Sequence, residues 1–419
     1  MPDFRFRLPP IGELTNAQQI AYNYEGGLMV TGGPGSGKTV VSIYRFRRTM
    51  LNDQNGMFFT FNRTLMAAVK GTFKQAAEII FPDLTDIQRT DLINNNVASI
   101  FEWYGARFHL KLSDESSEDI ENNFRTFISN NRGNAKFAEL VIDESQDLHP
   151  NIIRSANHLG LIVSCGADRS QDLQGHYAPN PADDVIFDLL PHNTNRQELT
   201  RNFRNTKEIF EFARKLVPED IDVQNIDPDE LPEGEDPDLR SGLSKDEQNT
   251  LIKEIIEQNP KLNIGILMHF KSQVIALKTY LEQNGFSCAE NAPEGTSFSY
   301  YYNGLPIGDR HVMENRLQTP FILTFDSCKG LEFDIVIIPY FEKANWALTN
   351  QRQAQDSDRI WQNVFNADGS AKMWANPKHY YVGVTRARRQ LYILYNETPN
   401  ILNFHNTEQQ DLFPDNLPF

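Results

Sequence analysis

The chain has 419 residues, enough for two or three domains, and its 40% hydrophobic and 23% charged residues are typical of a globular protein. There is no apolar run long enough to cross a membrane, and the N-terminus lacks the apolar core of a signal peptide, so we expect neither a membrane span nor export. The net charge of −16 argues against a broad basic surface for nucleic acid but leaves room for a local groove. The three cysteines lack metal-ligand spacing and indicate a reducing compartment, so we expect a cytoplasmic protein.

A residue that could recognise a base precedes the first strand. The amide of Gln18 can both donate and accept hydrogen bonds, so it could bind an adenine edge. An ordinary surface glutamine is the alternative interpretation of this position.

A glycine-rich stretch follows the first buried strand, which is predicted over residues 28–30. Residues 32–39 match the pattern G-x-x-x-x-G-K-[ST] at every fixed position. The glycines let backbone N–H groups point at phosphate oxygens, Lys38 supplies a charge for the β- and γ-phosphates, and Thr39 offers a hydroxyl to Mg²⁺. A helix over about residues 40–50 directs its N-terminus at the same anion. The predicted phosphate-binding loop (P-loop) consists of Gly32, Gly33, Pro34, Gly35, Ser36, Gly37, Lys38 and Thr39.

The next part of the chain contains a strand over residues 57–62 and a helix over 64–77. A polar insertion over about 80–135 follows, with helical patches. It contains three neighbouring aromatic residues, which we interpret as part of the core rather than as a base-stacking platform. They are Phe101, Trp103 and Tyr104.

Two carboxylates end a buried strand that begins at residue 138. At the carboxyl edge of a parallel sheet, Asp143 would hold Mg²⁺, mainly through water, and Glu144 would orient and deprotonate the attacking water. The alternative is that either carboxylate caps the following helix. Another buried strand over 161–166 leads into a polar loop, residues 167–171, at the same edge.

Strands and helices alternate again in the second half, so the sequence predicts two α/β domains with parallel sheets. The predicted helices are 247–258, 272–284 and 380–388, and the predicted strands are 263–269, 321–324, 335–338 and 391–394. We place the domains at residues 1–190 and 191–400, followed by a flexible tail, 401–419. The second domain includes an acidic loop over 218–240, interpreted as solvated, and a tyrosine-rich insertion without regular pattern over 286–318.

Four motifs follow the P-loop in a fixed order, at residues 143–147, 199–205, 329–333 and 381–388. Together they resemble the UvrD/Rep/PcrA-like branch of superfamily 1 DNA helicases, and the resemblance spans nearly the whole chain. It implies two tandem RecA-like P-loop domains. The intervals in which full-length relatives insert accessory subdomains are short here, so we expect these subdomains to be reduced or absent.

The resemblance also implies roles for single residues, with ATP as substrate and Mg²⁺ as cofactor. Gln18 resembles the glutamine that recognises adenine, Phe203 the aromatic residue that stacks on it, and Glu332 the ribose contact. Gln171 resembles a γ-phosphate sensor coupled to the DNA site, and Arg204 and Arg386 resemble two arginine fingers. Arginine suits this last role because its guanidinium is planar, multidentate and always protonated.

The DNA side departs from the family pattern. Positions that usually carry histidine, aromatic or basic residues carry others here, and the loss of a stacking aromatic would weaken binding to single strands by about 1–3 kcal/mol. The departures are Val40, Phe101, Gln174, His176 (beside Tyr177) and Asp326.

The tail contains the sequence Gln-Gln-Asp-Leu-Phe at residues 409–413. It resembles the short peptide that docks on the bacterial sliding clamp, with Leu412 and Phe413 as apolar anchors and Gln409 setting the register. The alternative is that these apolar residues pack on the body of the protein.

The function we expect is an ATP- and Mg²⁺-dependent DNA translocase or helicase, with 3′→5′ polarity implied by the resemblance, acting in repair, recombination or defence. The alternative is a nucleic-acid-gated ATPase switch that regulates a partner, such as a nuclease, without robust unwinding. A P-loop kinase or a GTPase fits poorly, because neither accounts for two arginine motifs in a second domain.

Overall fold

The computed structural model describes most of the chain and divides it into two compact units. The described residues are 8–52, 55–75, 81–130, 136–173, 176–177, 180–216, 226–288, 292, 295–306, 320–341, 378–399 and 402. We call Arg5–Phe203 with Asp222–Ile226 the P-loop unit, and Arg204–Ile221 with Asp227–Phe419 the C-terminal unit, which also includes Met1–Phe4. The predicted clamp residues Gln409, Leu412 and Phe413 lie outside the described residues, as does Gln174.

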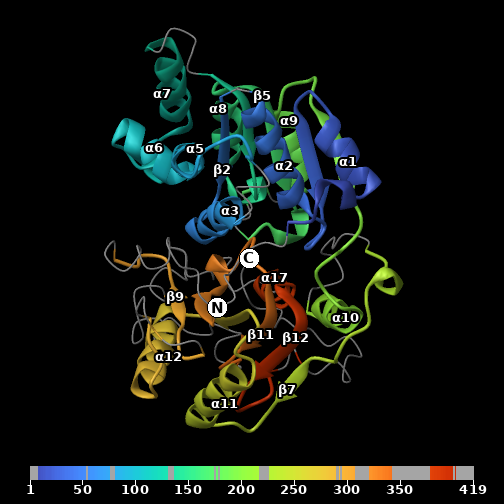
Figure 1. Ribbon diagram of the computed structural model, residues 1–419, viewed down its shortest axis with the longest axis vertical. Helices are drawn as coiled ribbons and strands as arrows, with labels where there is room; N and C mark the ends of the chain where they lie inside the picture. Colours follow the sequence, from blue (N-terminus) through green and yellow to red (C-terminus); the bar gives the residue numbers. More distant parts are fainter. Residues whose placement is uncertain are drawn as a thin grey trace, which may run out of the picture. The chain divides into compact units, whose positions relative to one another are not determined.

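The P-loop unit is built on a six-stranded parallel sheet in the order β3-β2-β4-β5-β1-β6. Figure 1 labels β2 and β5 of this sheet. The interior strands β1 and β2, each next to an edge strand, are buried along their whole length, as expected for a parallel sheet covered on both faces. Since all six strands are parallel, the loops after β1, β4 and β5 leave the sheet at one edge. The strands are β1 Leu28–Gly32, β2 Gly56–Thr60, β3 Val97–Ser99, β4 Phe137–Ile142, β5 Gly160–Ala167 and β6 Asn195–Leu199.

Eight α-helices of the P-loop unit are described. A capping box between Thr15 and Gln18 starts α1, and a second one between Thr85 and Gln88 starts α5. The predicted insertion over 80–135 contains α5, β3, α6 and α7. The helices are α1 Asn16–Asn23, α2 Lys38–Leu51, α3 Arg63–Gln75, α5 Asp86–Asn96, α6 Ile100–Phe108, α7 Ser117–Asn130, α8 Pro150–Ala156 and α9 Ala182–Leu189.

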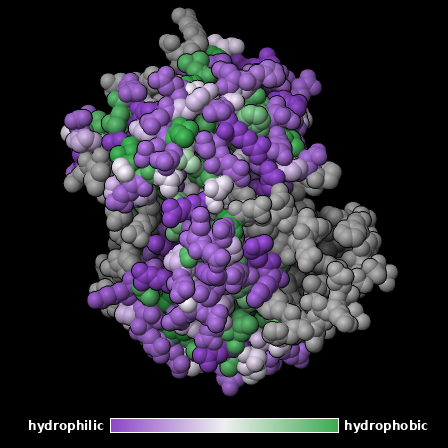
Figure 2. Space-filling view, turned by 90° about the vertical axis from the view of Figure 1, so that its right-hand side faces the viewer, coloured by the Kyte–Doolittle hydropathy of each residue, from purple (hydrophilic) through white to green (hydrophobic). Residues whose placement is uncertain are grey.

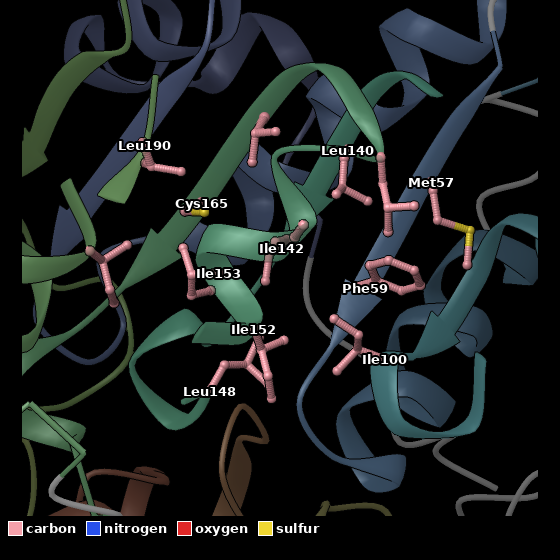
Figure 3. Close-up of a cluster of buried hydrophobic side chains, with 14 of the residues drawn as sticks. Met57, Phe59, Ile100, Leu140, Ile142, Leu148, Ile152, Ile153, Cys165 and Leu190 are labelled. Atoms are coloured by element: carbon pink, nitrogen blue, oxygen red, sulfur yellow. The ribbon is translucent and has the colours of Figure 1, made fainter. Parts of the chain in front are cut away.

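A large apolar core of this unit lies on one face of the sheet (Figure 3). Side chains such as Phe59 and Ile142 from the strands pack there with Ile153 of α8. Trp103 belongs to this core and lies edge-on to Phe59, with ring centroids 5.2 Å apart. Tyr104 is buried in it, while Phe101 packs at its margin. The interpretation of the aromatic residues of the insertion as core is confirmed for Trp103 and Tyr104.

The C-terminal unit contains a second six-stranded parallel sheet, in the order β7-β12-β11-β8-β10-β9. Its central strands β8, β10 and β11 are short apolar runs, and their burial explains their composition. The prediction of two tandem α/β domains of RecA-like type is confirmed. The strands are β7 Asp238–Arg240, β8 Ile264–Met268, β9 Ser299–Tyr301, β10 Phe321–Thr324, β11 Phe333–Ile338 and β12 Ala387–Leu394, and the α-helices described are α10 Lys207–Lys215, α11 Lys245–Gln258, α12 Lys271–Gln283 and α17 Lys378–Val384.

Three details differ from the sequence prediction. The predicted helix over 380–388 ends at Val384, and its basic end instead begins β12. The insertion over 286–318, expected to be irregular, contributes strand β9, which pairs with β10. The units divide at residues 203 and 204 rather than at 190, because β6 pairs with β1 in the first sheet.

Exposed hydrophobic side chains are scattered over the described surface. On the face shown in Figure 2, hydrophilic residues predominate and hydrophobic residues form small separate groups. Among the described residues, no helix is long and apolar enough to cross a membrane.

Candidate nucleotide-binding site

The P-loop joins β1 to α2 at the carboxyl edge of the first sheet. Gly35 (φ 71°) and Gly37 (φ 91°) adopt left-handed conformations that side chains disfavour. A Cβ atom at Gly37 would lie only 2.3 Å from the amide nitrogen of Gln18. The hydroxyl of Ser36 is buried and has no hydrogen-bond partner among the described residues. A phosphate oxygen is the kind of group that would satisfy it.

Lys38 is the central cation of this loop. Its ammonium donates to the carbonyl oxygens of Gly32 (2.6 Å) and Gly33 (2.9 Å) and lies 3.4 Å from a carboxylate oxygen of Asp168. The side chain is 8% exposed. Asp168 therefore supplies the counter-charge for a buried ammonium, at the end of β5.

The predicted metal ligands Thr39 and Asp143 are brought together. The Thr39 hydroxyl donates to Oδ2 of Asp143 at 2.7 Å. Burial, and then the negative charge of Glu144, raise the pKa of the Asp143 carboxyl to about 7. Gly166 faces this carboxylate, because a Cβ there would lie 2.8 Å from Oδ1 of Asp143.

These donors fit Mg²⁺ better than a cation that needs a protein cage. No group of three or more histidine, cysteine or acidic residues that could hold a metal occurs in the described part of the chain. Mg²⁺ is typically held by one or two carboxylates, a hydroxyl, water and substrate phosphates. One hydroxyl and one carboxylate, beside a phosphate-binding loop, match that set.

Glu144 has a strained backbone. Its φ of 54° places a non-glycine residue in the left-handed region, which costs about 1–3 kcal/mol and is common at functional sites. Its carboxylate accepts a hydrogen bond from the side-chain amide of Gln146 at 2.5 Å. The side chain of Gln146, to which the motifs assign no role, therefore holds the carboxylate of Glu144.

The loop after β5 brings Gln171 to the same edge. Its side-chain amide donates to Oδ2 of Asp168 at 2.5 Å, the oxygen that also faces Lys38. The backbone N–H of Asp168 donates to the side-chain oxygen of Gln146 at 3.2 Å. The structure thus connects the predicted sensor Gln171 with Lys38 and Glu144 through Asp168 and Gln146. Neither connecting residue was predicted, because a single sequence does not show which polar side chains are buried together.

Two predicted base contacts also adjoin the P-loop. The amide of Gln18 accepts from the N–H of Thr15 (3.0 Å) and donates to the carbonyl of Ser36 (3.2 Å). The N–H of Phe203 donates to the carbonyl of Gly35 at 2.9 Å, and the residue is 49% exposed. Gln18 is therefore not an ordinary surface glutamine, and Phe203 is a partly exposed aromatic residue whose ring centroid lies 5.4 Å from the guanidinium carbon of Arg201.

A buried ion pair beneath the P-loop helix was not predicted. Arg45 of α2 and Glu139 of β4 are 1% and 3% exposed and are joined by a hydrogen bond of 2.7 Å. Hydroxyls of Thr49 (2.8 Å) and Ser164 (2.7 Å) also donate to Glu139, while Arg45 donates to three carbonyl groups, those of Ala21, Tyr24 and Gly26. Burial lowers the pKa of Arg45. The pair holds α1, α2 and β4 together.

The C-terminal unit brings together its three predicted site residues. Arg204 donates to Glu332 at 3.2 Å and to the carbonyl of Thr385 at 3.4 Å. The neighbouring residue Arg386 is 1% exposed and donates to the carbonyl of Val382 at 2.8 Å. The two arginines therefore lie close together in this unit, with Glu332 as an acidic partner.

The positions that depart from the family pattern have other partners here. Tyr177 is buried, and its hydroxyl donates to the carbonyl of Leu148 at 2.5 Å, so its ring is not available for base stacking. Burial raises the pKa of its hydroxyl. Asp326 pairs with His379 at 3.4 Å. The ring of His176 lies 5.3 Å from that of His149.

Comparison with known proteins bears on the second half of the chain. Residues 307–398 match the family model described as the UvrD-like helicase C-terminal domain. This segment is therefore similar to the C-terminal domain of UvrD-like helicases. This match confirms the resemblance inferred from the motifs, and it includes the arginine motif around Arg386 and the segment containing Glu332.

Two similar proteins carry related names. "DNA helicase II" of Rickettsia typhi (strain ATCC VR-144 / Wilmington) is 33% identical over 96 residues, which make up 22% of this chain and 13% of that protein. The chain thus matches only about an eighth of that relative's length. The C-terminal domain of a possible DNA helicase from a Lactobacillus (strain WCFS1) shares 15% identity over 48% of this chain and 92% of that one, with a TM-score of 0.28, which is too low to support an argument.

Proposed function

We propose that this UvrD-like protein is a Mg²⁺- and ATP-dependent DNA translocase or helicase of the cytoplasm. The observation that carries the proposal is the edge of the first sheet. There Lys38 and Thr39 follow β1, while Asp143 and the strained Glu144 follow β4, and these two parallel strands lie on either side of β5. The match of residues 307–398 to the UvrD-like helicase C-terminal domain supports DNA as the polymer along which the protein would move.

The chemistry assigned to this edge is phosphoryl transfer to water. Lys38 and the loop N–H groups would bind the β- and γ-phosphates, and Thr39 and Asp143 would hold Mg²⁺, which would neutralise the phosphate charge. Glu144 would orient the attacking water and accept its proton. Phe203 and Gln18 would contact the adenine, and Glu332 the ribose. Arg204 and Arg386 would stabilise the charge that develops on the γ-phosphate.

Two assays test the motor proposal. The first is ATP hydrolysis with Mg²⁺ in the presence and absence of single-stranded DNA, with Glu144→Gln as the catalytically impaired control. The second is displacement of streptavidin from oligonucleotides that carry biotin at the 3′ or the 5′ end. A 3′→5′ translocase would clear streptavidin from the 5′ end faster than from the 3′ end. A DNA-stimulated ATPase that clears neither end would contradict the motor proposal.

ATP hydrolysis that DNA stimulates, without removal of streptavidin from either end, would favour a second candidate. This candidate is a nucleic-acid-gated ATPase switch that regulates a partner such as a nuclease. The burial of Tyr177 supports this candidate, because an aromatic residue beside the altered third motif is not available to stack on a base. The net charge of −16 points the same way.

A sliding clamp is a further proposed partner, through Gln409, Leu412 and Phe413. The proposal depends on the sequence of the tail alone. It predicts that the clamp retains the full-length protein in a pull-down experiment and does not retain a variant lacking residues 409–413.

A further inference from the structure

We infer that Gln146 is a positioning residue that holds the carboxylate of Glu144 in place for hydrolysis and connects it to the loop of Asp168. This inference rests on the proposed ATPase function and concerns the regulation of the same site. The inference is based on two hydrogen bonds of the buried Gln146 amide. Its nitrogen donates to Glu144 in the loop after β4, and its oxygen accepts from Asp168 in the loop after β5.

The orientation of the Gln146 amide follows from its partners. A carboxylate can only accept, so the nitrogen of the amide must face Glu144, at 2.5 Å. A backbone N–H can only donate, so the oxygen must face Asp168, at 3.2 Å. Gln146 is 0% exposed, so water does not compete for either bond.

Glu144 depends on this support more than an ordinary residue would. Its backbone is in the left-handed region, which places the side chain in an unusual direction. A hydrogen bond to a charged acceptor is stronger than a neutral one, so the amide restricts the carboxylate to one arrangement. A general base must be within hydrogen-bonding reach of the proton that it removes, so small displacements of this carboxylate would slow hydrolysis.

The side-chain oxygen of Gln146 contacts the loop after β5, which contains the predicted sensor Gln171. Asp168 binds both the Lys38 ammonium and the Gln171 amide through one carboxylate oxygen. A phosphate that engages Lys38 or Gln171 would compete with Asp168 for them. Any shift of the Asp168 backbone would then reach Glu144 through a single side chain, without passing through solvent.

Two variants of Gln146 and one control variant test its hydrogen bonds to Glu144 and Asp168. Gln146→Leu removes both. Gln146→Glu keeps an acceptor for the Asp168 N–H but cannot donate to Glu144 and places a second carboxylate beside it. Ser145→Ala is the matched control, because it removes a buried hydrogen bond of the same loop, from the Ser145 hydroxyl to the Gly166 carbonyl at 2.9 Å, that does not involve Glu144.

The measurements are kcat and KM for ATP, affinity for a non-hydrolysable ATP analogue, and thermal unfolding of each full-length variant. We expect both Gln146 variants to lower kcat by roughly 10- to 100-fold, the rate equivalent of one charge-assisted hydrogen bond, with analogue affinity changed less than about threefold. We expect Ser145→Ala to keep kcat within about threefold of the wild type. Wild-type kcat in Gln146→Glu, or an equal kcat loss in Ser145→Ala, would overturn the inference.

A double variant tests whether Gln146 acts through Glu144. In single-turnover experiments, Gln146→Leu should cause little further loss once Glu144 is already Gln, because the group that it positions is gone. Fully multiplied losses would show that Gln146 acts elsewhere. Absence of hydrolysis by the wild-type protein, with and without single-stranded DNA, would instead refute the proposed function itself.

Discussion

Asp143→Asn should increase the free energy of unfolding at neutral pH and greatly reduce ATP hydrolysis. A carboxyl group with an ordinary pKa near 3.8 titrates at about 7 in this site, mainly because it is buried. The folded protein therefore binds more protons than the unfolded chain between about pH 4 and pH 7, so its stability falls as the pH rises through this window. Asparagine carries no charge and escapes this penalty, yet its side-chain oxygen can still accept from Thr39.

The magnitude follows from the difference between the two pKa values. The difference is about three pH units, and each contributes about 1.36 kcal/mol, so the full effect is roughly 4 kcal/mol above pH 7. The free energy of unfolding of Asp143→Asn should thus match that of the wild type near pH 4 and exceed it by up to this amount at pH 8. ATP hydrolysis with Mg²⁺ should fall by roughly 100-fold or more, because the carboxylate that would hold the metal is lost.

Urea unfolding of both proteins at pH 5, 6, 7 and 8, followed by circular dichroism, measures this difference. Glu144→Gln is the matched control for the second cause of the raised pKa. It removes the neighbouring negative charge, which should lower the pKa of Asp143. The loss of stability with rising pH should therefore be complete at a lower pH than in the wild type. A stability difference between Asp143→Asn and the wild type that does not change with pH would refute the reasoning.

Further substitutions test other parts of the account. Lys38→Ala should abolish ATP turnover by removing the cation of the P-loop, and nucleotide binding measured by calorimetry should weaken with it; unchanged turnover would exclude the assigned site. Arg386→Ala should slow hydrolysis by roughly 10³-fold if it stabilises the γ-phosphate, whereas a loss below about tenfold would leave it a structural role only. Glu139→Ala should lower the free energy of unfolding by about 3–5 kcal/mol in urea titrations, since Arg45 stays buried without its carboxylate; an unchanged free energy would show that the pair does not stabilise the fold. Deletion of residues 409–413 should abolish retention by the sliding clamp and leave the ATPase rate unchanged; retention without these residues would exclude the motif.

The parts of the fold that could be predicted are those with local causes. Short apolar runs such as β1 and β4 identify buried parallel strands, and the glycine pattern of the P-loop is imposed by backbone geometry. Strand β6 was missed because it lies at the edge of its sheet and carries mainly polar residues, of which only Leu199 is buried. Strand β9 has three residues and an environment supplied by β10, which no local pattern shows.

The residues of the site also fall into those that a local motif predicts and those that depend on contacts between distant parts of the chain. Lys38, Thr39 and Asp143 follow from motif chemistry, and the structure brings them together. Gln146 and Asp168 could not be predicted, because their importance depends on which residues they touch across two loops. The Arg45–Glu139 pair joins residues 94 positions apart, and only the folded sheet places them in contact. The burial of Tyr177, beside the altered position His176, was likewise not predictable from the sequence.

The measurement that tests the central claim most directly is the steady-state rate of ATP hydrolysis with Mg²⁺, with and without single-stranded DNA, at low and at physiological salt. The account predicts hydrolysis that single-stranded DNA stimulates, less strongly as salt rises, because an acidic protein can offer DNA only a local basic groove. Absence of ATP hydrolysis at both salt concentrations, with DNA present, would contradict it.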